Sequence, residues 1–152
     1  MSNQIYGPDL TQRPPRSPRT RLGGYALLPR MLDKCRATLN GKNGEYHYNC
    51  PLDQHILKFA GVDAEALKAE VATGKGDGEI LAWIEANAAV KRQAWEIAQW
   101  SDFQERRGPD SDAETIGWFA ETVGKLSKTR EDIHTFADLL DLDDYVTFGG
   151  KA

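Results

Sequence analysis

Apolar residues that recur every three or four positions constrain the fold of this chain more than any other feature of its sequence. The clearest run, spaced 3, 4, 3 and 4 residues apart, consists of Tyr25, Leu28, Leu32, Cys35 and Leu39. Such spacing draws a single apolar stripe along an α-helix. It predicts a helix over residues 25–39, with Pro29 in or before its first turn and Asn40-Gly41 as its stop.

The same pattern returns along the rest of the chain, and capping or breaking residues bound each stretch. Pro51 suits the first position of a helix, and Gly61 suits the position just past its end. Asp63 and Asp112 can cap two further helices, and Thr129 with Asp132 resembles a capping box. The further predicted helices, with their capping residues included, cover residues 52–60, 63–72, 79–87, 90–107, 112–127 and 130–140.

Residues 1–23 lack this pattern and hold four prolines and four arginines. Proline removes hydrogen-bond donors and favours extended geometry in the preceding residue, so we expect an extended arm. A chain of 152 residues suits one domain. The predicted fold is therefore all-α: six or seven helices around one core over residues 24–152, the arm over 1–23, and room for one short β element near Tyr46.

Hydropathy and cysteine content point to a soluble, cytoplasmic protein. No apolar run approaches the ~20 residues of a membrane span, and residues 1–8 contain no apolar core of a signal peptide. The two cysteines, Cys35 and Cys50, are too few for a disulfide framework. We therefore expect a reducing compartment and no association with a membrane.

The net charge of −4 is unevenly distributed. Residues 1–50 hold 8 Lys and Arg against 3 Asp and Glu, whereas residues 51–152 hold 11 against 20. We expect the basic N-terminal part to pack on the acidic remainder. A nucleic-acid site needs basic residues on one face together with groups that contact bases, and the sequence offers no such arrangement, so no nucleic-acid binding is expected.

Reactive side chains concentrate in residues 44–53, which read Gly-Glu-Tyr-His-Tyr-Asn-Cys-Pro-Leu-Asp. The segment is either a short strand or an ordered loop. In a strand, Tyr46, Tyr48 and Cys50 would share one face, because side chains alternate. They either face the core or line a pocket with charged residues of the first helix. On the second reading, the candidate ligand-binding residues are Arg30, Asp33, Lys34, Tyr46, Tyr48, Cys50 and Asp53.

Cys50 has the clearest chemical direction, because it precedes Pro51 at a predicted helix start. The positive end of the helix dipole favours a thiolate there. The dipole contributes only ~0.3–1 kcal/mol, so a reactive thiolate also needs a cation within ~4–6 Å. Arg30 and Lys34 are the candidates for that cation.

Metal binding is not expected. His47, Cys50 and His55 are of the residue types that bind zinc, but the chain has no Cys-x-x-Cys or His-x3-His pair. A zinc site needs three or four ligands that converge. Asp53 and His55, two apart on a helix, diverge. No metal and no cofactor is predicted.

Trp95 and Phe103 fall off the inward stripe of the predicted helix over residues 90–107. Either a second layer of side chains buries them, or they mark an interaction surface. We expect the second layer.

Four stretches of sequence together resemble a bacterial family called domain of unknown function 5069. They are Arg16-Ser-Pro-Arg19, Leu22-Gly-Gly24, Arg30-Met-Leu-Asp-Lys34 and Tyr46-His-Tyr-Asn-Cys-Pro-Leu-Asp53. The resemblance continues through the tryptophan-rich middle and residues 138–144, so it covers nearly the whole chain. It implies a small, mostly helical, cytoplasmic bacterial protein, and it supplies no activity and no catalytic residues.

Two classes of function remain open. The first is a binding or interaction protein, whose partner is a small molecule or another protein. The second is a small enzyme or small-molecule receptor with a site around Cys50 and the charged face of the first helix. A pocket that joins Cys50 to that face would favour the second class.

Overall fold

A computed structural model describes residues 3–152 of the chain. Within that range seven helices and one two-stranded antiparallel sheet form, which confirms the all-α prediction. The elements are β1 (Arg21–Leu22), β2 (Tyr25–Ala26), α1 (Leu28–Leu39), α2 (Pro51–Ala60), α3 (Ala64–Val71), α4 (Asp77–Asn87), α5 (Ala94–Arg106), α6 (Ala113–Leu126) and α7 (Phe136–Thr147).

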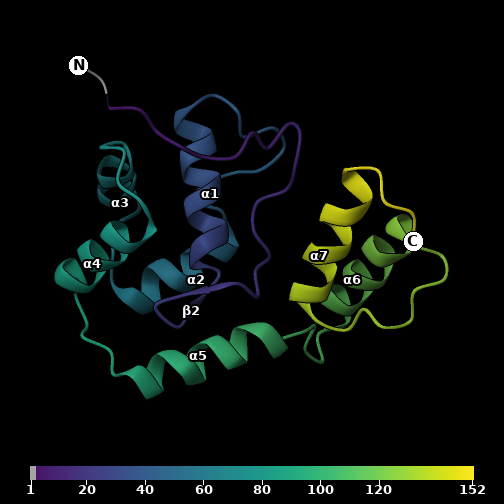
Figure 1. Cartoon of the computed structure of the whole chain (residues 1–152). Coiled ribbons are helices and arrows are strands. Elements are labelled where there is room, and N and C mark those ends of the chain that lie inside the picture. Colours follow the sequence, from purple (N-terminus) through teal and green to yellow (C-terminus); the bar gives the residue numbers. More distant parts are fainter. Residues whose placement is uncertain (1–2) are drawn as a thin grey trace.

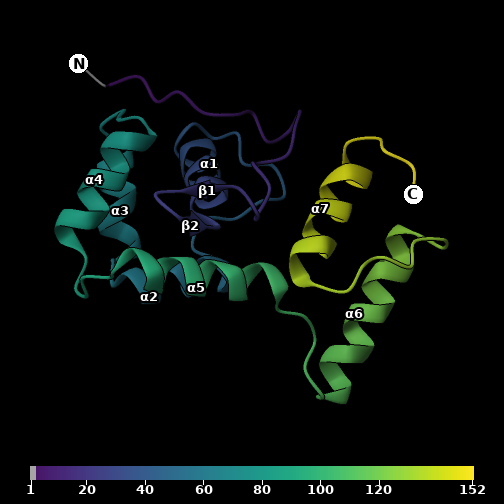
Figure 2. The same cartoon turned by 60° about the horizontal axis from the view of Figure 1, so that its bottom comes forward.

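Helix α1 lies at the centre of the molecule (Figure 1). Helices α3 and α4 lie on one side of it, and α6 and α7 on the other, while α5 links the two sides. Turning the molecule shows that α6 extends away from the remaining helices (Figure 2). No helix of residues 3–152 is both long enough and apolar enough to cross a membrane.

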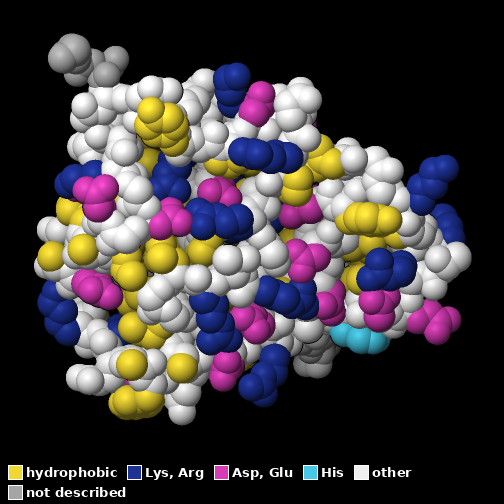
Figure 3. Space-filling model, viewed as in Figure 1, with side chains coloured by type: hydrophobic (Ala, Val, Ile, Leu, Met, Phe, Trp, Pro, Cys, Tyr) yellow, Lys and Arg dark blue, Asp and Glu magenta, His cyan; other side chains and the backbone are white. Residues whose placement is uncertain are grey.

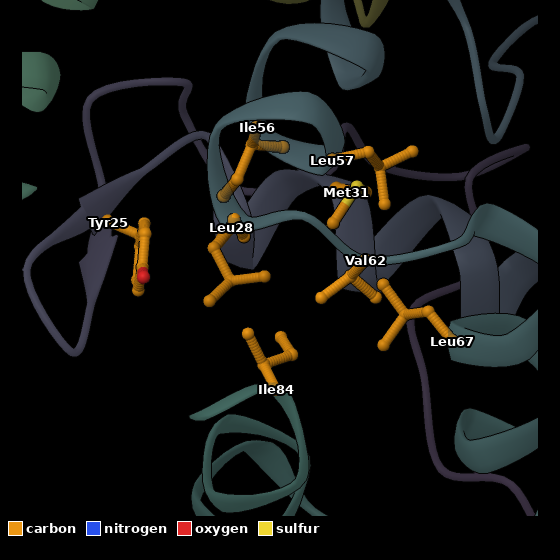
Figure 4. A pocket seen from close by; sticks show the side chains of 9 residues that line it. Tyr25, Leu28, Met31, Ile56, Leu57, Val62, Leu67 and Ile84 are labelled. Carbon is orange, nitrogen blue, oxygen red and sulfur yellow. The ribbon is translucent and has the colours of Figure 1, made fainter. Parts of the chain in front are cut away.

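The main core surrounds the apolar side of α1 and takes side chains from β2, α2, α3 and α4. Leu28, Leu32 and Cys35 are fully buried there, so the predicted stripe faces inward. Figure 4 shows core side chains turned toward one another around a small gap. That gap measures about 10 Å³, which is at the lower limit for a single water molecule. The core is therefore closely packed and leaves no room for a ligand.

The apolar side chains of residues 3–152 form two clusters rather than the one core expected. The second cluster lies between α6 and α7, where the ring of Phe119 meets that of Phe136 edge to face. Ile133, Leu139 and Leu142 complete it. The division arises because α6 stands apart from α1 and contacts α7 instead (Figure 2).

The extended arm packs between α1 and α7 (Figures 1 and 2). Leu10 is 2% exposed, and its N–H donates to the carbonyl of Lys42. The carbonyl of Pro18 accepts from the N–H of Leu27, which precedes α1. The predicted arm thus becomes part of the packed structure, although residues 1–2 lie outside the described range.

Several elements differ from the prediction. Helix α1 begins at Leu28 rather than at residue 25, because Tyr25 and Ala26 pair with β1, and α5 begins at Ala94 rather than at residue 90. The β element lies at residues 21–26, whereas residues 44–50 form turns and loop. The last helix was expected over 130–140 but covers 136–147. Its capping box is Thr135 with Asp138, because the hydroxyl and carboxylate of that pair satisfy N–H groups at the helix start. Residues 128–134 form a loop, at whose start Ser127 Oγ accepts from two backbone N–H groups.

The expectation for Trp95 and Phe103 is wrong, because each side chain is 62% exposed. Helix α5 turns its other side inward, where Trp100 stacks on Phe59 and Ser101 donates to the carbonyl of Gly24. Among residues 3–152, no second layer of side chains covers Trp95 and Phe103 on the outer side of α5.

Candidate functional site

The polar side of α1 is buried along with its apolar side. Arg30, Asp33, Lys34 and Arg36 are each at most 6% exposed. Burying a charge is costly unless it is paired, and each of these four meets an opposite charge from another part of the chain. Three of the four are candidate residues from the sequence.

Arg30 binds Asp144 of α7, with 2.8 Å between Nη1 and Oδ2. The hydroxyl of Tyr46 donates to Oδ1 of the same carboxylate at 2.7 Å. Burial and this hydrogen bond to an anion both raise the pKa of Tyr46. Arg30 and Tyr46 therefore meet as predicted, but they meet on a carboxylate of the chain itself.

Asp33 binds the arm. Its carboxylate accepts from the backbone N–H of Arg16 at 2.9 Å and from the Arg16 guanidinium at 3.0 Å. The same guanidinium reaches Asp77 at the start of α4, where Arg36 also binds at 2.7 Å. Arg16 and Asp77 were not among the candidate residues. The excess of basic residues in 1–50 and of acidic residues in 51–152 was the only sequence signal for the pairs with Asp77, and it gave none for Arg16 with Asp33.

Lys34 contacts two further candidate residues, Asp53 and Cys50. Its Nζ lies 2.9 Å from Oδ1 of Asp53 and 3.2 Å from Sγ of Cys50. The backbone N–H of Asn49 donates to the other oxygen of Asp53 at 3.0 Å. Cys50 is the N-cap of α2 and Pro51 its first residue, as predicted. The cation that a reactive Cys50 requires is therefore in place.

Tyr48 lies apart from these groups. Its hydroxyl donates to the carbonyl of Ala64 at 2.6 Å, and burial raises its pKa. Tyr46, Tyr48 and Cys50 are each more buried than their neighbours Glu45, His47 and Asn49. The predicted alternation therefore holds in a segment that is not a strand.

The seven candidate residues thus divide among separate ion pairs and hydrogen bonds, and none of them, Cys50 included, lines any of the five hollows described within residues 3–152. In the same range, no three His, Cys, Asp or Glu side chains come together in a way that could hold a metal ion.

A hollow of about 290 Å³ opens between α2, α6 and α7, and we call it the α2–α7 hollow. Nearly all of its exposed lining is apolar. Its lining residues are Pro51, Leu52, His55, Arg107, Trp118, Phe136, Leu139 and Leu140. Sequence reasoning selected none of these for a site, because they come from four separate segments, and the sequence does not reveal that these segments come together. Trp118, which is 53% exposed, forms part of the wall.

Two polar side chains interrupt the apolar wall. The guanidinium carbon of Arg107 lies 4.6 Å from the centre of the Phe136 ring. Burial lowers the pKa of Arg107, and the charge of Asp110 opposes this effect; an arginine nevertheless stays charged in proteins. Burial, followed by the charges of Arg107 and Lys58, lowers the pKa of His55. The hollow therefore presents one fixed cation and one neutral imidazole at neutral pH.

Comparison with protein families shows to which family the chain belongs. A family model described as "Domain of unknown function (DUF5069)" matches residues 12–146. The chain belongs to this family. The matched part of this DUF5069 protein contains both strands and all seven described helices except Thr147, so it includes the α1 ion pairs and the α2–α7 hollow. No curated protein matches the chain.

Proposed function

We propose that this DUF5069 protein is a binding protein, and that an apolar group of its ligand enters the α2–α7 hollow. The observation that carries the proposal is an open hollow whose wall is apolar except for Arg107 and His55. Small-molecule sites are mostly apolar clefts with a few placed polar groups. The hollow has that composition.

The α1 side chains favour binding over bond-breaking chemistry. Arg30, Asp33 and Lys34 already bind carboxylates or guanidinium groups of the chain. Breaking a buried pair by removing one partner costs ~3–5 kcal/mol, so these groups are not free to act on a substrate. Their contacts hold the arm, α2 and α7 against α1.

The test is a titration with 2-naphthamide, a neutral apolar probe, followed by ¹H–¹⁵N chemical shifts. We expect saturable shifts at the Trp118 indole and in α2 and α7. Trp118→Ala should weaken binding, whereas Trp95→Ala should not, because Trp95 is also exposed, at 62% against 53% for Trp118, but lies outside the hollow. Shifts that do not saturate, or equal losses in both variants, would contradict the proposal.

A second candidate function places a small enzyme or receptor site at Cys50. The contact of 3.2 Å between Lys34 Nζ and Cys50 Sγ favours it. Iodoacetamide should then alkylate Cys50 in the Cys35→Ser variant at neutral pH, and Lys34→Met should slow that reaction. If Cys50 does not react, or reacts equally in both proteins, the thiol is structural.

We also propose that the protein resides in the cytoplasm and does not bind nucleic acid. Cys35 and Cys50 are free thiols, and disulfides are rare in reducing compartments. Basic and acidic side chains intersperse on the face shown in Figure 3. A continuous basic surface, which phosphate binding requires, is not seen on that face. Salt-dependent retention of the protein on duplex DNA at ~0.15 M ionic strength would contradict the second point.

A further inference from the structure

The character of the α2–α7 hollow also bears on the chemical class of its ligand. We infer that this ligand is a small organic anion with an apolar body and one carboxylate, and that Arg107 binds the carboxylate. This inference rests on the proposed function. The apolar wall selects the body of the ligand. The volume of about 290 Å³ lies at the lower end of the ~300–1,000 Å³ usual for ligand sites, so a small molecule fits better than an extended peptide.

Arg107 differs from the arginines that bind α1 and the arm. Arg30 and Arg36 each bind a carboxylate of the chain. Arg107 makes no ion pair and no side-chain hydrogen bond with residues 3–152, and its guanidinium lies over the Phe136 ring. It is an unpaired, partly buried cation at an apolar wall. An anion from outside the chain would supply the opposite charge that Arg107 lacks among residues 3–152.

The position of Arg107 is fixed by the surrounding backbone. Its N–H donates to the carbonyl of Phe103 at the end of α5, and its carbonyl accepts from the N–H of Phe136 at the start of α7. These bonds hold the backbone of Arg107, and its guanidinium lies over the Phe136 ring. A guanidinium presents a planar set of donors that matches a carboxylate in two parallel hydrogen bonds. Partial removal from water strengthens the attraction. Arg107 can therefore distinguish an acid from a neutral analogue of the same shape.

The experiment compares 2-naphthoate with 2-naphthamide by calorimetric titration. For the wild-type protein we expect 2-naphthoate to bind about tenfold more tightly or better, which corresponds to ~1.4 kcal/mol. Arg107→Met keeps an unbranched side chain against Phe136 but removes the charge. In that variant the preference for the acid over the amide should vanish.

Arg106→Met is the matched control, because the neighbouring Arg106 is highly exposed and lies outside the hollow. It should keep the preference for the acid. Far-UV circular dichroism checks that both variants fold, and Arg107→Lys replaces Arg107→Met if the latter does not; it should reduce the preference.

The outcomes separate the two proposals. Equal binding of acid and amide, both weakened by Trp118→Ala, would overturn the anion inference and leave the binding function in place. Binding of neither probe would overturn both. Self-association that 2-naphthoate disrupts would show that a second copy of the chain occupies the hollow, and it would also overturn the inference.

Discussion

Lys34 shows at the scale of one residue why a charge can lie beside the core of this protein. Its Nζ contacts Asp53 and Cys50, and both Lys34 and Asp53 are almost fully buried. Removing one member of a buried pair costs ~3–5 kcal/mol, because the other charge stays behind without a partner. The pair therefore fixes α2 against α1, and its loss should be measurable.

We predict that Asp53→Ala lowers the free energy of unfolding by ~3–5 kcal/mol. The double variant Lys34→Met with Asp53→Leu should recover most of the loss, because no unpaired charge remains. Urea unfolding measures both. Lys125→Ala breaks the exposed pair with Glu121 and should cost less than ~1 kcal/mol. A loss in Asp53→Ala no larger than that of Lys125→Ala would contradict the buried-pair argument.

The sequence predicted part of the candidate site. Pro51 marked the start of α2 and so placed Cys50 at its N-cap. The sequence named Arg30 and Lys34 as candidate cations for Cys50, and Lys34 is the one that contacts it. The partners of Arg30 and Asp33 could not be predicted. Asp144 lies 114 residues from Arg30, and nothing local distinguishes it from the other carboxylates of the acidic part. The α2–α7 hollow could not be predicted either, because segments far apart in the sequence form its wall.

At the scale of elements, local signals predicted where most of the described helices end and where α2, α3 and α6 begin. Gly61 closes α2 in the left-handed conformation, with φ of +67°, and Asp63 and Asp112 cap α3 and α6. The predicted start of α7 was wrong, because Thr129 with Asp132 and Thr135 with Asp138 offer the same capping chemistry. The structure uses the second pair, and Leu139 and Leu142 of the helix that follows it join Phe119 in the second cluster.

Helix α4 gives a prediction for acid. Asp77, its first residue, binds Arg16 and Arg36. Burial acts to raise the pKa of Asp77, but hydrogen bonds from both arginines outweigh it, and the pKa is lowered. A lowered pKa in the folded state means that the unfolded state binds more protons in acid. This contribution to stability is present above pH ~4, the ordinary range for aspartate, and is lost as pH falls through the folded value.

Asp77→Asn should therefore destabilise the protein at pH 7 and flatten the decline of stability between about pH 5 and 3. Urea unfolding at several pH values measures both effects. Asp110→Asn removes an exposed aspartate that forms no ion pair within the described residues, and it should leave the acid limb unchanged. A parallel decline in wild type and Asp77→Asn would contradict the role of Asp77.

At the scale of the whole molecule, the two apolar clusters raise the question of how many units unfold. Arg30 joins α1 to α7 through Asp144, and Arg19 of the arm binds Asp138 and Asp141 of α7. We propose that these contacts make residues 1–152 one domain. Unfolding followed by helical circular dichroism and by tryptophan fluorescence should then coincide, with or without EDTA and reductant. A separate, earlier transition of α6 and α7 would show two units.

The arm should contribute to stability far more than its surface charges suggest. Deleting residues 1–23 removes Leu10, which is buried, and leaves Asp33 without its partner Arg16. Exposed ion pairs contribute only ~0–1 kcal/mol each, whereas Leu10→Ala alone should cost ~2–5 kcal/mol because it empties a buried site. We therefore expect the deletion to lower the free energy of unfolding by several kcal/mol in urea. Tyr6→Ala, at an exposed position of the same arm, should leave the urea midpoint unchanged. A deletion variant with the wild-type midpoint would mean that the arm does not hold α1 and α7 together.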